Sequence, residues 1–168
     1  MTTCPSPSDL IPNMVGELKT LLKERGIENA CMIGIHTGGV WLAEKLHKEM
    51  AIDSALGALN ITFYRDDFTR IGMHPQVTPS SLEFEVEDQH IILVDDVLHT
   101  GRTIRAALNE IFDYGRPASV ILVTLVDRSG RELPISADVT GVQLALGPKE
   151  QIKLNGPEPL SLEVQETS

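Results

Sequence analysis

Three short apolar runs, separated by helical patterns, constrain the fold of this chain more than any other feature. The runs are CMIGI at 31–35, IILVD at 91–95 and VILVTLV at 120–126. Strand–helix–strand order occurs twice along the chain, and these strands are apolar throughout instead of alternating with polar residues. Such runs are typical of a mainly parallel sheet that is covered by helices on both faces. We therefore predict an α/β fold around a mainly parallel, twisted sheet.

The segments between these runs complete the predicted organisation. Apolar residues at helical spacing predict helices over 10–25, 40–50 and 103–114, and an alternating pattern predicts a further strand over 58–64. Trp41, inside the second helix, is expected to serve packing. The last forty or so residues read as short β segments and turns. Residues 1–8 are rich in Pro and Ser and are expected to be disordered, which leaves 9–168 as a single domain.

The segment 65–81 has no clear periodicity and contains Gly72, Pro75 and Pro79. A loop of this length inside a compact domain is usually functional or disordered. We therefore expect it to have a role at a binding site.

Charge and composition exclude several classes of protein. The 168 residues carry 24 acidic and 14 basic side chains, a formal net charge of -10, which disfavours a general nucleic-acid binder. No apolar run approaches the roughly 18 residues of a membrane span, and no signal peptide is recognisable, so we expect no membrane partner and a cytoplasmic location. Cys4 and Cys31 lack the spacing of metal ligands.

Ligands of parallel sheets bind beyond the carboxyl ends of the strands, where three turns are expected: 36–39, 95–103 and 127–133. The central turn, VLHTGRT, lies between a strand and a helix. Gly101 permits a positive φ, two threonines supply hydroxyls, and the N–H groups at a helix start favour an anion. The P-loop and dinucleotide-binding patterns are missing from the sequence. The turn therefore predicts a phosphate site of another kind.

Asp95 and Asp96 stand directly before this phosphate turn. Carboxylates do not bind phosphate themselves, but they bind sugar hydroxyls or a magnesium ion that also holds phosphates. The alternative is that one aspartate caps the turn and the other is solvated. The combination of an apolar strand, an acidic pair and T-G-x-T favours a site for a ribose phosphate with a divalent metal.

Four stretches, in the same order along the chain, resemble the PyrR family of pyrimidine operon regulator/uracil phosphoribosyltransferase proteins, within the type I phosphoribosyltransferases. They are IGIHTGGVWLAEKL, ITFYRDD, ILVDDVLHTGRTIRAALNEIFDYGRPASV and LVDRSGRELPISADVTG. The resemblance covers about residues 30–141. It implies the type I phosphoribosyltransferase fold, with a small β-containing hood and a mobile lid at 65–81. It also implies that 5-phosphoribosyl 1-diphosphate (PRPP) and uracil react, with Mg²⁺, to give UMP and diphosphate.

The resemblance also implies roles for individual residues. Asp95 and Asp96 would hold the ribose, directly or through Mg²⁺. The 5′-phosphate would be bound by Val97, Leu98, His99, Thr100, Gly101, Arg102 and Thr103. The diphosphate would contact Thr37, Gly38 and Gly39, together with Arg65, which would also act in catalysis, and Arg70. The nucleobase would be met, largely through backbone groups, by Val126, Asp127 and Arg128, with Arg131 as a further candidate.

Two details of this assignment stay open. Relatives often carry an arginine where this sequence has Gly38, which removes one side-chain contact to the diphosphate. Asp127 could instead only cap its turn. The resemblance further implies a homo-oligomer, a dimer or larger.

Two other functions compete with the enzyme. The family's second role is a regulator that binds pyr mRNA and senses UMP or PRPP with little turnover. Basic residues are available for it at Lys19, Lys23, Arg25, Lys45, Lys48, Arg105 and Arg116, but the acidic balance disfavours RNA binding. A phosphoacceptor receiver domain also uses a strand-end acidic pair. There the pair lies near the amino terminus, and the T-G-R-T turn has no use.

Overall fold

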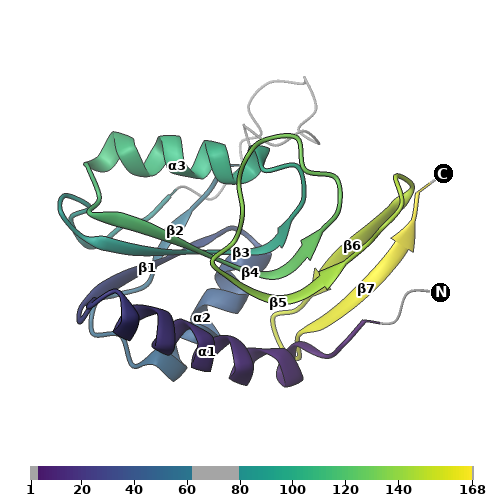
Figure 1. The fold of residues 1–168 in the computed structure, drawn as a ribbon, viewed down its shortest axis with the longest axis horizontal. Helices are drawn as coiled ribbons and strands as arrows, with labels where there is room; N and C mark the ends of the chain where they lie inside the picture. Colours follow the sequence, from purple (N-terminus) through teal and green to yellow (C-terminus); the bar gives the residue numbers. More distant parts are fainter. Residues whose placement is uncertain (1–3, 62–79, 168) are drawn as a thin grey trace.

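The computed structural model describes residues 4–61 and 80–167. Within them, a five-stranded sheet has the order β2-β1-β3-β4-β5, and every neighbouring pair is parallel (Figure 1). The strands are β1 (Ala30–Ile35), β2 (Gly57–Leu59), β3 (His90–Leu98), β4 (Ser119–Arg128) and β5 (Val139–Leu144). The predicted parallel α/β sheet is confirmed.

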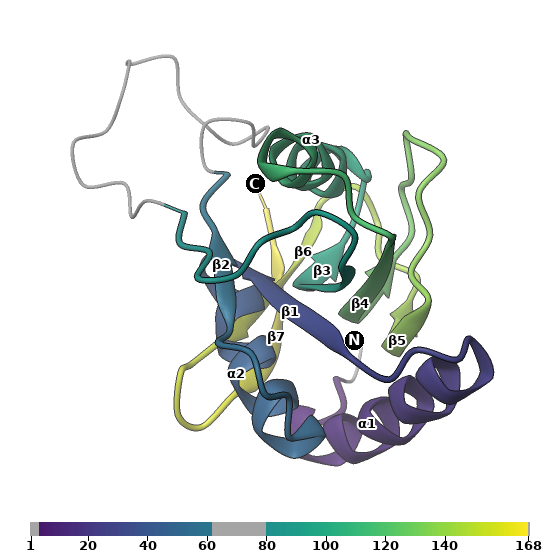
Figure 2. The same ribbon diagram turned by 90° about the vertical axis from the view of Figure 1, so that its left-hand side faces the viewer.

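Helices cover both faces of this sheet. The helices α1 (Pro7–Glu24) and α2 (Gly38–Met50) pack on one face, and α3 (Arg102–Tyr114) packs on the other (Figures 1 and 2). Met32 and Ile92 contribute to the core on the α1/α2 side, whereas Ile33 and Ile91 contribute to the core on the α3 side. Successive strand residues point to opposite faces, so burial on both faces requires strands that are apolar throughout.

No helix in the two described segments has both the length and the apolar character needed to cross a membrane.

The helices begin earlier than the sequence pattern predicts. Helix α1 starts at Pro7, with Ser6 as its N-cap residue, so Pro7 and Ser8 of the predicted tail are helical. Proline is suited to the first turn of a helix because the N–H it lacks would have no partner there. Helices α2 and α3 start two residues and one residue before the predicted positions 40 and 103.

Strands β3 and β4 extend further than predicted, to Leu98 and Arg128. They stay paired at Val97 with Val126 and at Leu98 with Asp127. The acidic pair at 95–96 therefore lies within β3, whereas the sequence pattern placed it at the end of a strand. Strand β2, by contrast, ends at Leu59, so the predicted strand over 58–64 is wrong at residues 60 and 61, while 62–64 lie outside the described residues.

Most of the segment predicted as a lid, including Arg65 and Arg70, lies outside the described residues. Its last two residues, Ser80 and Ser81, are described and are anchored at two places. Ala58 and Ser81 exchange two backbone hydrogen bonds of 2.8 and 2.7 Å. The Ser80 hydroxyl donates a 2.7 Å hydrogen bond to Oε1 of Glu110 on α3.

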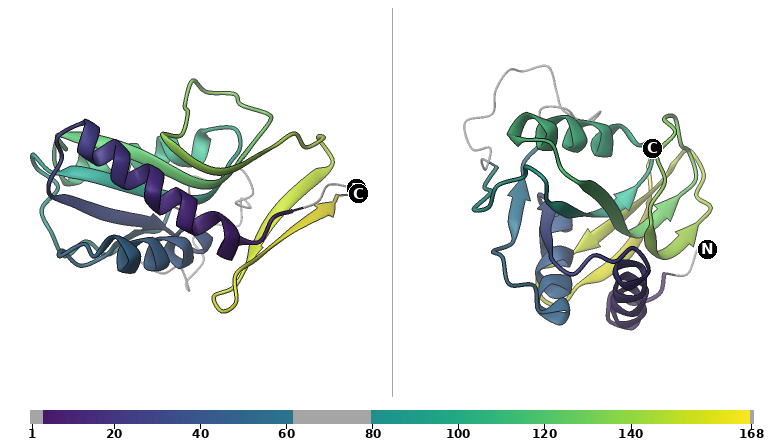
Figure 3. Two further views of the ribbon diagram at one scale, coloured as in Figure 1. Left: turned by 60° about the horizontal axis from the view of Figure 1, so that its bottom comes forward. Right: turned by 60° about the vertical axis from the view of Figure 1, so that its left-hand side comes forward.

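The predicted hood is confirmed as an antiparallel pair, β6 (Glu150–Asn155) and β7 (Ser161–Glu166), which projects from one end of the molecule (Figure 3). Leu154 and Leu160 join the core on the α1/α2 side. Trp41 packs against the turn of this hairpin, since a Cβ built on Gly156 would lie 2.8 Å from the indole Cε3. The expected packing role of Trp41 is confirmed.

Candidate active site

A cavity of about 550 Å³ lies at the carboxyl ends of the strands, between the turn that follows β3 and the hood. We call it the ribose-phosphate cavity. Its lining residues are Asp95, Asp96, Val97, Leu98, His99, Thr100, Gly101, Thr103, Ile104, Glu132, Gln151 and Ile152. All the residues that the sequence predicts for ribose and 5′-phosphate binding are therefore present except Arg102. Strands β3 and β4 both point toward the hood that closes this end (Figure 1).

The phosphate turn has the geometry that its sequence predicts. Gly101 has φ 96° and forms the N-cap of α3, so the turn uses the left-handed conformation that glycine favours. The Thr100 hydroxyl accepts a 3.1 Å hydrogen bond from the N–H of Arg102. The first N–H groups of a helix have no partner within the helix, and the helix dipole favours an anion near them. The turn can therefore hold a phosphate group.

The Arg102 side chain is paired with Glu132, a residue of the cavity wall. Its Nε donates a 2.9 Å hydrogen bond to Oε1 of Glu132, and both side chains are about half exposed, at 49% and 54%. The guanidinium of Arg102 is thus held in an exposed ion pair, and the role of this residue in phosphate binding stays a prediction.

The two aspartates have different environments. Asp95 is only 1% exposed, and its Oδ1 accepts a 2.8 Å hydrogen bond from the N–H of Asp96. Asp96 is half-buried, and its Oδ1 accepts a 2.8 Å hydrogen bond from the N–H of Val97. The carboxylate of Asp96 is thus the more accessible of the two.

This donor set fits a magnesium ion that is held mainly by its substrate. Mg²⁺ is commonly bound by one or two carboxylates together with phosphate oxygens and waters. The described residues contain no cluster of three or more His, Cys, Asp or Glu side chains in a metal-binding arrangement. Asp96, with Asp95 behind it, would therefore supply the protein's share of the ligands.

The turn at residues 36–39, which the resemblance assigns to diphosphate, packs directly against β3. We call it the diphosphate turn. A Cβ on Gly39 would lie 2.7 Å from the carbonyl oxygen of Val94, and a Cβ on Gly38 would lie 2.9 Å from Cγ of Asp96. Gly39 is therefore required by the close approach of the β3 backbone, whereas a side chain at residue 38 would meet the side chain of Asp96. The peptide bond from His36 to the exposed Thr37 is cis.

His36 lies at the start of the same turn. Burial lowers the pKa of its imidazole, and the nearby carboxylate of Glu44 opposes that shift.

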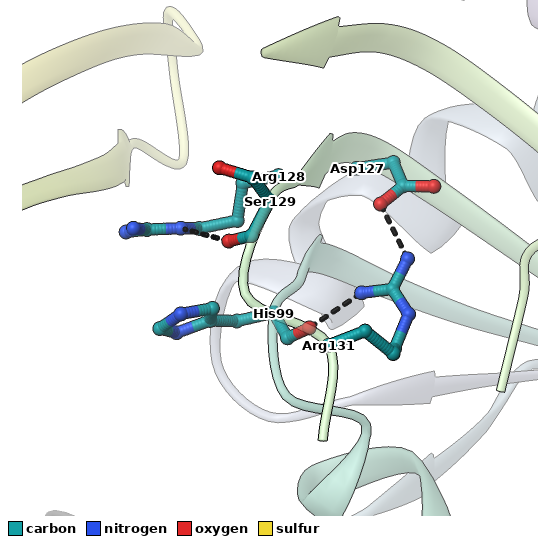
Figure 4. Close-up of polar contacts among 5 residues, drawn as sticks. All are labelled: His99, Asp127, Arg128, Ser129 and Arg131. Atoms are coloured by element: carbon teal, nitrogen blue, oxygen red, sulfur yellow. Dashed lines mark hydrogen bonds and ion pairs between the residues drawn. The ribbon is translucent and has the colours of Figure 1, made fainter. Parts of the chain in front are cut away.

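The turn at residues 127–133 is joined to the phosphate turn by the side chain of Arg131. The Arg131 guanidinium donates a 2.6 Å hydrogen bond to Oδ1 of Asp127 and another to the carbonyl oxygen of His99 (Figure 4). The carbonyl oxygen of Thr100 also accepts hydrogen bonds of 2.9 and 3.0 Å from the N–H groups of Glu132 and Leu133. These contacts make one unit of the two turns.

The nucleobase residues predicted from sequence do not all face a cavity. Val126 is 0% exposed and belongs to the hydrophobic core, so its side chain cannot contact a base. Strand β4 is paired with β3 and with β5 at Val126 and Asp127, so their backbone groups belong to the sheet. A second cavity of about 430 Å³ is lined by Asp127, Arg128, Ser129, Gly130, Arg131, Gln143, Leu144 and Ala145.

Arg128 is only 6% exposed, and its guanidinium binds backbone carbonyls. It donates to the oxygens of Glu150 at 2.7 Å, Gly147 at 3.2 Å and Ser129 at 3.3 Å. Burial lowers the pKa of this guanidinium, and the charge of Glu150 opposes the shift. Figure 4 shows it directed away from Asp127 and Arg131. Its side chain is thus directed toward the hood.

Comparison with known proteins agrees with this geometry. Residues 12–158 match the phosphoribosyl transferase domain family. The chain is 60% identical over 159 residues to the Bifunctional protein PyrR of Pseudomonas paraeruginosa, which covers 95% of this chain and 94% of that protein. It is 61% identical over 158 residues to the Bifunctional protein PyrR of Nitrosococcus oceani, with coverage of 93% and 89%. The chain belongs to the PyrR family of type I phosphoribosyltransferases.

Solved structures show the same fold at low identity. A hypoxanthine-guanine phosphoribosyltransferase from Bacillus anthracis has a TM-score of 0.69 at 19% identity, over 90% of this chain and 86% of that one. The hypoxanthine phosphoribosyltransferase of Trypanosoma cruzi has a TM-score of 0.66 at 18% identity, over 95% and 91%. At this identity the likeness shows the fold alone, so it does not assign the base that this PyrR-family chain uses.

Four residues of the ribose-phosphate cavity were not predicted as site residues: Ile104, Glu132, Gln151 and Ile152. Glu132 lies in the stretch RELP, which carries part of the PyrR resemblance, so that stretch could have indicated it. Gln151 and Ile152 belong to the hood, whose sequence has no pattern that points to a ligand. Their place in the wall depends on how β6 docks on the sheet.

Proposed function

We propose that this PyrR-family chain transfers the 5-phosphoribosyl group of PRPP to uracil and releases UMP and diphosphate. The observation that carries the proposal is that one cavity is walled by the acidic pair Asp95–Asp96 and by the phosphate turn at the start of α3. A ribose phosphate needs both kinds of group at this spacing, because carboxylates suit its hydroxyls and helix N–H groups suit its 5′-phosphate.

The reaction needs no nucleophile from the protein. The bond from the anomeric carbon to diphosphate breaks, the ribose becomes oxocarbenium-like, and uracil N1 forms the new bond as it loses its proton. The turn 97–103 would fix the 5′-phosphate, and Asp96 would face the ribose. Bound Mg²⁺ would neutralise part of the diphosphate charge. Rate acceleration then comes from positioning and from charge stabilisation.

The test is direct. The wild-type chain is incubated with PRPP and Mg²⁺, and diphosphate release is compared for uracil, orotate, hypoxanthine and adenine. Uracil should be consumed fastest. Much faster consumption of hypoxanthine or orotate would show that the proposed base is wrong, even though the fold and family stand.

We propose further that the chain works as a dimer or a larger homo-oligomer in the cytoplasm. The resemblance to the PyrR family supports the assembly, and the cysteine usage supports the location. Light scattering on the purified chain would test the assembly, and a monomer at working concentration would contradict it.

A second function requires its own test because the relatives are named bifunctional. We propose that RNA binding by this chain is weak. The basic residues singled out from sequence are divided between α1 and α2 on one face and the α3 side on the other (Figure 2). Arg25 is paired with Asp138 at 3.3 Å and Lys45 with Glu158 at 3.0 Å. Tight, specific binding to the chain's own pyr leader RNA at physiological salt would overturn this proposal.

A further inference from the structure

Arg128 is a buried cation whose guanidinium donates hydrogen bonds to three backbone carbonyls. A buried charge is costly unless its donors are satisfied, and here the oxygens of Ser129, Gly147 and Glu150 satisfy them. Two of these oxygens belong to the segment that leads into the hood. Arg128 itself is the last residue of β4, which is held between its neighbours β3 and β5 in the sheet. The residue therefore connects a rigid strand to the hood.

Ser129 reinforces the same connection. Its hydroxyl donates to the oxygen of Leu146 at 3.0 Å and accepts from the N–H of Leu146 at 3.1 Å. Its own N–H donates to the oxygen of Leu144 at 3.1 Å. Oε1 of Glu150 accepts a 2.8 Å hydrogen bond from the N–H of Gly147, which closes the turn before β6. The path of residues 144–150 is thus held by hydrogen bonds from the end of β4.

The hood's contribution to the ribose-phosphate cavity begins at the next residue. Gln151 and Ile152 line that cavity opposite the phosphate turn, and Gln151 directly follows the carbonyl group that Arg128 binds at 2.7 Å. A shift of the 147–150 segment would therefore move this wall. The phosphate turn itself is held elsewhere, through Arg131, Glu132 and Leu133.

We propose that Arg128 is a positioning residue, which sets the hood wall formed by Gln151 and Ile152 and so fixes the width of the ribose-phosphate cavity without lining that cavity. This inference rests on the proposed transfer reaction. Only a guanidinium suits the task, because it presents several donors in a planar fork and here reaches carbonyls from three different residues. A lysine ammonium concentrates its donors at one point and cannot span them.

The variants Arg128→Lys and Arg128→Met test the proposal, with Arg116→Lys and Arg116→Met as controls. Arg116 is exposed and lies just before the amino end of β4, whereas Arg128 is at the carboxyl end of the same strand. The hood should stay folded in every variant, because Leu154 and Leu160 anchor it in the core. For Arg128→Met the KM for PRPP should rise about tenfold or more, because the wall of the cavity proposed for its ribose phosphate is no longer fixed. Arg128→Lys should recover little of the loss, and both Arg116 variants should match the wild type.

Hydrogen exchange on the ligand-free chain supplies a readout that does not depend on turnover. Exchange of residues 145–155 should be faster in Arg128→Met than in the wild type, and exchange in the phosphate turn should not change. A lower melting temperature with unchanged KM values would assign Arg128 a merely structural role and overturn the proposal. A rise in the KM for uracil alone would place the effect outside the ribose-phosphate cavity and would also overturn it.

The two hypotheses can fail separately. If the wild type consumes no uracil, the proposed function fails, and the exchange measurement alone then decides whether Arg128 positions the hood. If the wild type consumes uracil but exchange of 145–155 is the same in Arg128→Met, the proposed function stands and the positioning role is rejected.

Discussion

Gly38 lies directly against the side chain of Asp96, so that the diphosphate turn and the acidic pair share one small space. A Cβ on residue 38 would lie 2.9 Å from Cγ and 3.2 Å from Cβ of Asp96. Since real Cβ atoms do not approach so closely, any side chain at residue 38 displaces the Asp96 carboxylate.

Gly38→Ala should therefore reduce activity more than stability. The Asp96 side chain can rotate away from the new methyl group, so the loss of stability should be about 1 kcal/mol at most. A misplaced carboxylate should nevertheless reduce turnover on the order of 10²-fold. Diphosphate release and thermal melting of the same variant measure the two effects.

Gly16→Ala is the matched control for this substitution. No atom lies within 4 Å of a Cβ at Gly16, which is inside helix α1. This variant should keep full activity and gain roughly 0.5–1 kcal/mol of stability. Unchanged turnover in Gly38→Ala would contradict the shared space inferred for residues 38 and 96.

Asp95→Asn and Asp96→Asn should each lower activity on the order of 10²–10³-fold, as expected for the loss of one preorganised electrostatic contact. The fold should survive, because the amide oxygen introduced by Asp95→Asn can still accept the N–H of Asp96. The magnesium dependence should shift more in Asp96→Asn, whose carboxylate is the more accessible. Diphosphate release at a series of Mg²⁺ concentrations measures this. Near-normal turnover in the double variant would remove the main support for the proposed site.

Asp127 and Arg131 should be energetically coupled. Their pair has a 2.6 Å contact and side chains that are 18% and 27% exposed, so solvent screens it only in part. A cycle of Asp127→Asn, Arg131→Met and the double variant should give a coupling on the order of 1 kcal/mol in the free energy of unfolding. The exposed pair of Arg102 and Glu132 is the control and should give a smaller coupling. Equal couplings for the two pairs would contradict the difference in burial.

His36 should make stability depend on pH. Burial lowers the pKa of its imidazole in the folded chain, so below about pH 6.5 the unfolded chain binds the proton more readily than the folded chain. Its contribution to stability is therefore complete above that pH and is lost as the pH falls. In His36→Gln, the free energy of unfolding should decrease less on acidification from about pH 7 to pH 5 than in the wild type. Urea unfolding at several pH values measures this, and identical slopes would contradict it.

The main elements of the site could be predicted because they are local in sequence. The apolar strand, the acidic pair and the turn around Gly101 are consecutive along the chain, and each residue type suggests its own chemistry. The side-chain environments of Arg102, Val126 and Arg128 could not be predicted in this way. Arg102 binds Glu132, Val126 points into the core, and Arg128 binds the hood, and all three contacts come from residues distant in sequence or from strand register.

The sequence by itself determined the parallel α/β sheet, the phosphate turn and the family, because apolar runs, glycine positions and short motifs are properties of contiguous residues. Only the tertiary structure decided how far β3 and β4 extend, which aspartate is accessible and which hood residues complete the cavity. Those features depend on pairing between strands and on the docking of β6 and β7, which bring together residues as far apart as Asp96 and Gln151. Burial and side-chain direction are set by that packing, so no local pattern could report them.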